Sequence, residues 1–350
     1  MRPCGVYNIS YKQDRAVVRT KLQWSWLIAL FVFIFIIPLF SKEYFLTLGI
    51  LTGITIISLH GLNILMGYTG QLSLGHAAFM AVGAFTAVNL VVQFHIPFLF
   101  AIIGGGLVTA LVGILFGAPS LRIKGFYLVM ATLAAHYVVF FIIHRWEGIG
   151  GFIGKLAPPA NIGPLSFDTT PKFYVLVAVF AILATYSALN MPRSNTGRAF
   201  VAVRDQDIAA MILGINVSYY KLLAFGISSF YAGIAGGLFA FYLGIAHTQF
   251  FSLTQAVWYL GMLIVGGLGS TLGPIFGAIF FQIINELSTY AGPLILKILP
   301  VLGEAAASQL ANIFWAIVIL FFIIKEPRGI NHAWVVLKNL YRLHPFSRKY

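Results

Sequence analysis

Long apolar runs, each about as long as a membrane-spanning helix, follow one another along most of the chain. A helix needs about 20 predominantly apolar residues to cross the hydrocarbon core of a bilayer. The pattern therefore predicts an all-α polytopic membrane protein with about ten transmembrane helices. The predicted spans are Trp24–Phe40, Phe45–Met66, Leu72–Phe94, Pro97–Gly117, Phe126–Ile143, Phe173–Asn190, Leu222–Ala246, Gln255–Leu268, Leu272–Gly292 and Gln309–Ile324.

Composition and charge support a membrane protein and predict its orientation. Of the 350 residues, 60% are hydrophobic and 9% charged, whereas soluble domains carry about 25% charged residues. The net charge of +13 would suggest nucleic-acid binding in a soluble chain, but 17 of the 22 Lys and Arg residues lie on one side of the predicted spans. This asymmetry predicts that both termini are cytoplasmic. The single cysteine, Cys4, excludes an internal disulfide.

The spans and loops predict one transmembrane domain over residues 24–324, flanked by cytoplasmic basic segments, 1–23 and 325–350. A long loop, 144–172, faces outward, and a second, 191–221, faces the cytoplasm. Ten spans divide into two halves of five. Because each half has an odd number of spans, equivalent helices would run in opposite directions, as in an inverted repeat. The segment "GYTGQLSLG" weakly resembles "GGLGSTLG", which begins at Gly266, but their positions in the two halves do not match, so the repeat stays open.

Polar residues and glycines interrupt the apolar pattern between Gly61 and Phe85. One interpretation is a tight cytoplasmic turn between two complete spans. The other is a discontinuous helix whose break lies at membrane depth and lines a transport path, where irregular backbone is tolerated because protein or water covers it. The candidate path residues are Asn63, Gly67, Gly70, Gln71, Ser73, Gly75 and His76.

The cytoplasmic loop contains a stretch, Arg204–Gly214, whose pattern predicts a short helix. Acidic residues in a first turn favour the helix dipole, and Gly214 suits a left-handed helix end. The exposed apolar edge fits either a groove on a partner protein or lipid headgroups, and two acids favour the protein slightly. The candidate docking residues are Arg204, Asp205, Asp207, Ile208, Met211, Leu213 and Gly214.

Residues for metal binding or catalysis are scarce. His60, His76 and His136 share no span at ligand spacing, so no metal site is expected. Neither a Gly-x-Ser-x-Gly nor a His-Glu-x-x-His motif is present, which argues against an enzyme. Few ionisable residues lie within spans, so an ion-coupled transporter is weakly supported.

Four blocks together resemble the permease subunits of branched-chain amino-acid ABC importers of the LivM type, over about Phe45–Arg328. The blocks are "GLNILMGYTGQLSLGHAAFMAVGAF", "PSLRIKGFYLVMATLA", "GRAFVAVRDQDIAAMILGINVSYYKLLAFGISSFYAGIAGGLFA" and "GGLGSTLGPIFGA". The outward loop reads "EGIGGFIG" where the family often has "TGG-x-x-G", a looser match.

The resemblance implies a permease in the bacterial inner membrane, with no cofactor of its own and with ATP and magnesium used by separate subunits. The implied partners are a second permease of the LivH type, two ATPase subunits and an extracytoplasmic substrate-binding protein. In this family the loop that includes Arg204–Gly214 couples to the ATPase. Alternatives are a related importer for urea or short amides, an ion-coupled secondary transporter and a non-transporting scaffold.

Overall fold

The computed structural model describes residues 21–123, 125–162, 165–298, 304–326 and 328–343. Helices account for nearly all of its regular structure. The α-helices are α2 (Lys21–Phe40), α3 (Glu43–Leu62), α4 (His76–Phe94), α5 (Phe98–Gly117), α6 (Phe126–Arg145), α7 (Thr170–Asn190), α8 (Asn195–Asp205), α9 (Asp207–Ile212), α10 (Val217–Leu243), α11 (Leu253–Gly266), α12 (Gly273–Ile298), α13 (Glu304–Lys325) and α14 (Gly329–Leu343).

Shorter elements connect these helices. The π-helical turn η1 extends α3, while η2, η3 and η4 are 3₁₀ turns. Their bounds are Asn63–Tyr68 for η1, Ala118–Leu121 for η2, Met191–Arg193 for η3 and Thr248–Phe251 for η4. The strands are β1 (Lys155–Leu156), β2 (Asn161–Ile162), β3 (Leu165–Ser166) and β4 (Ile245–Ala246).

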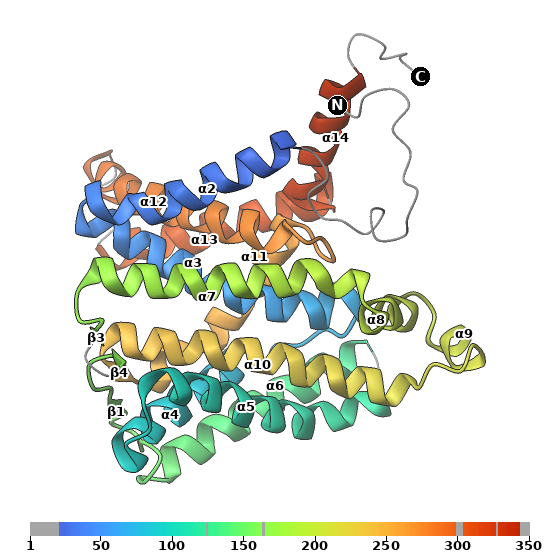
Figure 1. Ribbon diagram of the computed structural model, residues 1–350, viewed down its shortest axis with the longest axis horizontal. Helices are drawn as coiled ribbons and strands as arrows, with labels where there is room; N and C mark the ends of the chain where they lie inside the picture. The colour runs from blue at the N-terminus through green and yellow to red at the C-terminus, as the bar shows by residue number, and fades with distance from the viewer. Residues whose placement is uncertain (1–20, 124, 163–164, 299–303, 327, 344–350) are drawn as a thin grey trace.

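The long helices lie side by side with their axes roughly aligned (Figure 1). Helix α10 packs against α5, α4 and α3, and α3 also packs against α7. The short helices α8 and α9 project at one end of the bundle, which we call the α9 end, and the short strands lie at the opposite, strand end (Figure 1). The N-terminal end of α2 and the C-terminal end of α13 both lie at the α9 end (Figure 1).

The helical lengths confirm a polytopic α-helical membrane protein. Among the described residues, seven stretches are long and apolar enough to cross a membrane, and three shorter apolar helices accompany them. The seven are Glu43–Tyr68, His76–Phe94, Phe98–Leu121, Phe126–Arg145, Thr170–Arg193, Val217–Leu243 and Thr248–Gly266, and the shorter ones are Trp24–Phe40, Gly273–Leu287 and Phe314–Lys325. Each predicted span overlaps one of these helices.

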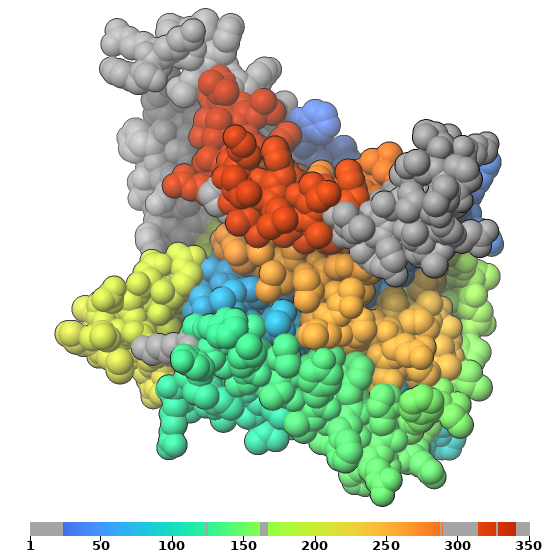
Figure 2. All heavy atoms as spheres, turned by 180° about the vertical axis from the view of Figure 1, so that it is seen from behind, coloured from blue at the N-terminus to red at the C-terminus, as the bar shows by residue number. Residues whose placement is uncertain are grey.

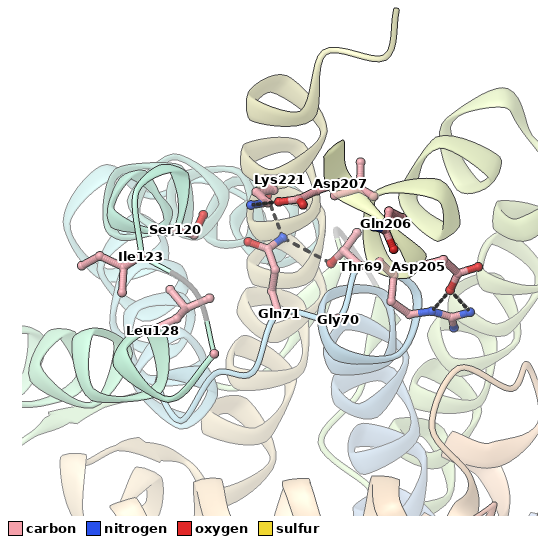
Figure 3. A pocket seen from close by; sticks show the side chains of 13 residues that line it. Thr69, Gly70, Gln71, Ser120, Ile123, Leu128, Asp205, Gln206, Asp207 and Lys221 are labelled. Atoms are coloured by element: carbon pink, nitrogen blue, oxygen red, sulfur yellow. Dashed lines mark hydrogen bonds and ion pairs between the residues drawn. The ribbon is translucent and has the colours of Figure 1, made fainter. Parts of the chain in front are cut away.

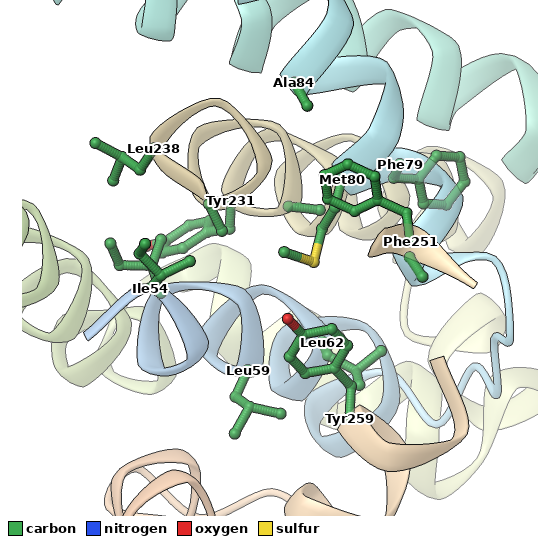
Figure 4. Packing of buried hydrophobic residues seen from close by; sticks show 14 of the residues in the cluster. Ile54, Leu59, Leu62, Phe79, Met80, Ala84, Tyr231, Leu238, Phe251 and Tyr259 are labelled. Carbon is green, nitrogen blue, oxygen red and sulfur yellow. The ribbon is translucent and has the colours of Figure 1, made fainter. Parts of the chain in front are cut away.

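Small residues allow the central helices to approach closely. A Cβ added to Gly236 on α10 would overlap the Met80 carbonyl oxygen on α4, and one added to Gly83 would overlap Gly233. Around this contact, buried apolar side chains from α3, α4, α10 and α11 form the core (Figure 4). Because lipid provides no hydrophobic drive for helix association, this close packing supplies van der Waals contact that stabilises the bundle.

The loop between α6 and α7 pairs with a segment that is distant in the sequence. Strand β1 pairs antiparallel with β4, with Lys155 opposite Ala246. The His144 Nε2 atom lies 2.7 Å from the Thr248 hydroxyl, and the Asn89 amide donates to the Ile149 carbonyl at 2.7 Å. These bonds tie the loop between α6 and α7 to the ends of α4 and α10.

Two features differ from the sequence-based expectations. The expected single helix Arg204–Gly214 is wrong, because the chain is extended at Gln206 (φ −159°) and separates α8 from α9. The tail after Lys325 was expected only as a basic segment, yet it contains α14. The predicted basic residues within 1–20 and 344–350 lie outside the described residues.

Candidate translocation and coupling site

Helix α3 does not stop at the end of its regular part but widens into η1. Such π-helical turns are uncommon and often occur at functional sites. After Tyr68 the backbone is irregular, and α4 begins at His76. We call the irregular segment Thr69–Gly75 break 1.

Break 1 runs back along α3 towards the middle of that helix. The His76 Nε2 atom lies 2.8 Å from the Ser58 hydroxyl. Since Ser58 precedes Tyr68 by ten residues of helix, the start of α4 lies about 15 Å from the end of η1, measured along the axis. Helix α4 therefore begins beside the middle of the α3–η1 stretch, and the non-helical segment between them runs back along α3.

Protein covers most of break 1, as irregular backbone in a membrane requires. The side chains of Thr69, Gln71 and Ser73 are each at most 4% exposed. The Leu74 amide donates to the Thr132 hydroxyl at 3.1 Å, and the Gly75 amide donates to the Ser73 hydroxyl at 3.2 Å. The freed backbone groups thus find partners on α6 and within the segment itself.

A second glycine-rich interruption, Gly267–Leu272, separates α11 from α12, and we call it break 2. Asn63 joins it to η1: its side-chain amide donates to the Ser270 carbonyl at 2.8 Å, and its oxygen accepts from the Gly269 amide at 2.9 Å. A Cβ on Gly67 would lie 2.5 Å from the Gly269 nitrogen. The two segments that weakly resemble each other in sequence are therefore in contact.

Arg204, at the end of α8, reaches the same junction. Its Nη1 atom donates to the Gly67 carbonyl at 2.9 Å, and Asp205 holds the guanidinium through Nε at 2.9 Å and Nη2 at 2.8 Å. The Gly67 carbonyl is near the end of a helical segment, where cations complement unsatisfied carbonyls. Gly70 (φ +69°) allows this approach, because a Cβ there would lie 2.9 Å from the Arg204 Cγ atom.

The other residues predicted for docking divide between two environments. Asp205 ends α8 instead of beginning a helix, whereas Asp207 lies in the first turn of α9. Gly214 has φ +81° and ends the segment in the left-handed conformation, as predicted. The apolar residues are exposed: Ile208 at 59%, Met211 at 54%, Ile212 at 82% and Leu213 at 79%.

Between these elements lies a cleft of about 320 Å³ at the α9 end (Figure 3). Its walls come from the start of break 1, from residues 203–207, from Lys221, and from Ser120, Ile123, Gly125 and Leu128. The Gln71 amide donates to the Lys221 carbonyl at 3.3 Å and to the Thr69 hydroxyl at 3.2 Å. The Lys221 ammonium lies 3.8 Å from the Asp207 carboxylate. The cleft thus connects break 1 to both α8 and α9.

The structure brings most of the predicted residues together. Asn63, Gly67, Gly70 and Gln71 lie beside Arg204, while Ser73, Gly75 and His76 lie deeper along α3. The sequence did not predict that Lys221, Gly269 and Ser270 belong to this site. It predicted that Arg204 contacts a partner protein, whereas in the structure Arg204 binds the Gly67 carbonyl. The resemblance between the two glycine-rich segments was the available signal for the contact of Gly269 with Gly67. Nothing in the local pattern indicated Lys221.

No group of three His, Cys, Asp or Glu side chains able to hold a metal ion occurs in the described part of the chain. His60 instead lies 3.0 Å from the Thr185 hydroxyl, and His136 stacks on Phe140 with ring centroids 4.5 Å apart. The His60 contact links α3 to α7, whereas the His136 stack lies within α6.

A polytopic helical bundle with two contacting helix breaks, and with paired short helices projecting from one end, fits a membrane transport permease. The chain matches the family described as the permease component of branched-chain amino-acid transport systems, over residues 43–323. The protein belongs to this family.

Individual relatives agree with this assignment. The chain is 31% identical over 299 residues to the high-affinity branched-chain amino acid transport system permease protein LivM of Escherichia coli (strain K12), covering 78% of this chain and 70% of LivM. LivM of Salmonella typhimurium is 30% identical with the same coverage. The autoinducer 2 import system permease protein LsrC of Enterobacter sp. (strain 638) is 26% identical over 215 residues, covering 59% of this chain and 60% of LsrC. No solved structure matches significantly.

Proposed function

We propose that this chain is a permease subunit of an ATP-driven ABC importer for leucine, isoleucine and valine in the bacterial inner membrane. Family membership and the LivM relatives carry the assignment to branched-chain amino-acid transport. In this proposal all ten apolar helices span the bilayer, the α9 end faces the cytoplasm, and both termini are cytoplasmic. The excess of Lys and Arg on that side supports this orientation.

The proposed partners are a second permease of the LivH type, two ATPase subunits and an extracytoplasmic substrate-binding protein. ATP and magnesium are used by the ATPases, and this chain binds no cofactor. The exposed apolar residues of α9 support docking of an ATPase, because a short helix with an apolar edge fits a groove on a partner. The ordered outward loop at the strand end offers a surface for the binding protein.

The junction at Gly67 supports a mechanism for coupling. When the ATPases close, they displace α8 and α9 as a lever on the bundle. Arg204 transmits this displacement, because its guanidinium holds the Gly67 carbonyl where η1 meets break 2. Asn63 then carries the movement to the loop between α11 and α12. Both helix breaks respond together, which opens the bundle to one side or the other.

Break 1 is the proposed lining of the transport path. Gln71, Ser73 and His76 offer hydrogen-bonding groups to a zwitterion without a fixed charge. This suits a substrate delivered already bound, because a strongly charged site would retain it. Irregular backbone also adapts more readily than a regular helix when neighbouring helices move.

Reconstitution of the full complex in proteoliposomes tests the proposal. We expect leucine to accumulate only when this chain, the second permease, both ATPases, the binding protein and ATP are all present. Uptake by this chain alone, driven by a proton or sodium gradient, would instead establish a secondary transporter. Replacing leucine by urea or acetamide distinguishes the amide importers, and absence of any solute flux with all partners present would establish a scaffold.

A further inference from the structure

The last described helix, α14, leaves the bundle instead of packing along it. Gly329 anchors its start, since a Cβ there would lie 2.6 Å from the Gly267 Cα atom. One turn later, the Trp334 ring lies 6.2 Å from the ring of Phe276 on α12. Beyond Trp334 the described side chains, up to Leu340, are all exposed. The helix therefore presents most of its surface to whatever surrounds the bundle.

The sequence of α14 divides this surface into two faces. Ile330, Trp334 and Leu337 recur at spacings of four and three residues, so they share one face, and Leu340 continues it. Leu337 is 60% and Leu340 56% exposed. The apolar face begins against the bundle at Ile330 and Trp334 and continues past its edge. A face of this kind needs an apolar covering.

The direction of α14 indicates which kind of surface can contact its apolar face. In Figure 1 α14 points steeply upward at the edge of the bundle, at a large angle to the horizontal axes of α7 and α10, and it lies towards the α9 end. Where α7 and α10 cross the bilayer, α14 therefore runs along its surface. Figure 2, from behind, shows the orange-red C-terminal helices apart from the yellow α8–α9 projection. On this side of the molecule, the C-terminal helices and the helices that we assign to the ATPases are therefore separate parts of the surface.

The charges around α14 favour an anionic surface. Lys325, Arg328 and Lys338 lie within or just before the helix, whereas Glu326 is engaged by His332, whose Nδ1 atom is 2.8 Å from the carboxylate. Lys338 lies next to Leu337 in sequence and is exposed. An amphipathic helix with basic residues on its polar face and Trp and Leu on the other lies in the interface of a membrane that contains anionic lipids.

We propose that α14 lies in the cytoplasmic leaflet's interface, with Trp334, Leu337 and Leu340 in the acyl-chain boundary and Lys338 among anionic lipid headgroups. The orientation of this surface rests on the cytoplasmic assignment of the α9 end. The lipid contact anchors the segment after the last span, next to the Gly267 end of break 2.

Site-specific fluorescence in the assembled transporter tests the proposal. Cys4 is replaced by Ser, a single cysteine is introduced by Leu337→Cys, and it carries an environment-sensitive dye. The complex is reconstituted in vesicles of phosphatidylcholine, or of equal parts phosphatidylcholine and phosphatidylglycerol. In the anionic vesicles we expect quenching by lipids spin-labelled near the headgroup and protection from aqueous iodide. The matched control, Asn339→Cys, should show the reverse preference.

A second variant tests the charge. Adding Lys338→Gln to the labelled Leu337→Cys chain should lower the ratio of lipid-docked to undocked helix about fivefold in anionic vesicles, with no change in neutral ones. A Leu337 dye protected from both quenchers would place a protein on this face and overturn the proposal. Equal docking in both vesicle types, unaffected by Lys338→Gln, would overturn the preference for anionic lipid. Leucine uptake by the same vesicles is measured separately, so a failure of docking is not confused with a failure of the transport assignment.

Discussion

At the scale of single residues, Arg204 occupies a position that its sequence context did not indicate. It lies in a charged loop segment and would ordinarily be assigned to the solvent or to a partner. Its guanidinium instead joins Asp205 on α8 to the backbone of η1. A hydrogen bond that involves a charged group contributes about 1.5–3 kcal/mol, so this contact is strong enough to transmit a displacement.

The variant Arg204→Gln removes the charge-assisted bond to Gly67. Leucine uptake by the reconstituted complex should fall about tenfold, since a loss near 1.5 kcal/mol corresponds to roughly that factor. Co-purification of the ATPases should persist, because α9 is unchanged. The control is Arg198→Gln on the same helix, where the side chain is exposed. Equal uptake by both variants would contradict the coupling role of Arg204.

Gly236 gives a prediction about stability. In Gly236→Ala the new methyl group overlaps the Met80 carbonyl oxygen, and α4 and α10 must separate. Overpacking of this kind costs about 1–3 kcal/mol, so the detergent-solubilised protein should unfold at a lower temperature. For comparison, Gly104→Ala meets only the Leu90 Cδ1 atom at 2.8 Å, the flexible end of a side chain. An unchanged midpoint for Gly236→Ala would show that the helices are less closely packed in solution.

At the scale of elements, the paired helices α8 and α9 make different kinds of contact. Helix α8 faces inward through Arg204, and α9 presents exposed apolar side chains outward. The extended Gln206 between them directs their residues to different surfaces. Helix α9 is therefore connected to the bundle both through Gln206 to α8 and through the Asp207–Lys221 ion pair to α10.

The variant Leu213→Asp places a charge where an apolar contact with the ATPase is proposed. Leu213 is 79% exposed, so the fold should tolerate the change while ATPase co-purification falls strongly. Ile153→Asp is the matched control, because Ile153 is 85% exposed at the strand end. Retention of the ATPase by Leu213→Asp would contradict the docking of this edge and favour its contact with lipid.

The sequence predicted the elements well where their pattern is local. Apolar runs located each membrane helix, and Gly214 marked the end of the coupling segment. It did not predict the division at Gln206, because short charged helices carry little periodic signal. It also left the depth of break 1 open, since the Ser58–His76 contact that defines it joins residues 18 apart through tertiary packing.

At the scale of the whole molecule, the bundle has two chemically different ends. The α9 end has cationic residues, two helix breaks and a cleft, while at the strand end β1 pairs with β4. The charge asymmetry was predictable from loop composition alone. The meeting of break 1, break 2 and α8 was not, because it depends on contacts between residues as far apart as Asn63 and Ser270.

Single-cysteine labelling tests the orientation of the molecule. With Cys4 replaced by Ser, a cysteine at Ile153 should react with a membrane-impermeant maleimide in intact spheroplasts, because the proposed topology places the strand end outward. A cysteine at Leu213 should react only after the membrane is permeabilised. Both side chains are highly exposed, so accessibility to solvent does not bias the comparison. The opposite labelling pattern would reverse the proposed topology and its assignment of ATPase docking.

The junction at Gly67 has a consequence for how the permease is dissected genetically. Arg204 binds a carbonyl oxygen, and Asn63 binds a carbonyl and an amide, so half of each contact belongs to the main chain. Alanine scanning leaves those atoms in place. At Ser270 it removes the hydroxyl that bonds Gly267 and Gly273, but it keeps the carbonyl that Asn63 contacts. Residue insertions or deletions within Gly267–Leu272 shift the main-chain atoms themselves. A tolerance map of short insertions would therefore outline this junction more completely than a catalogue of point mutants.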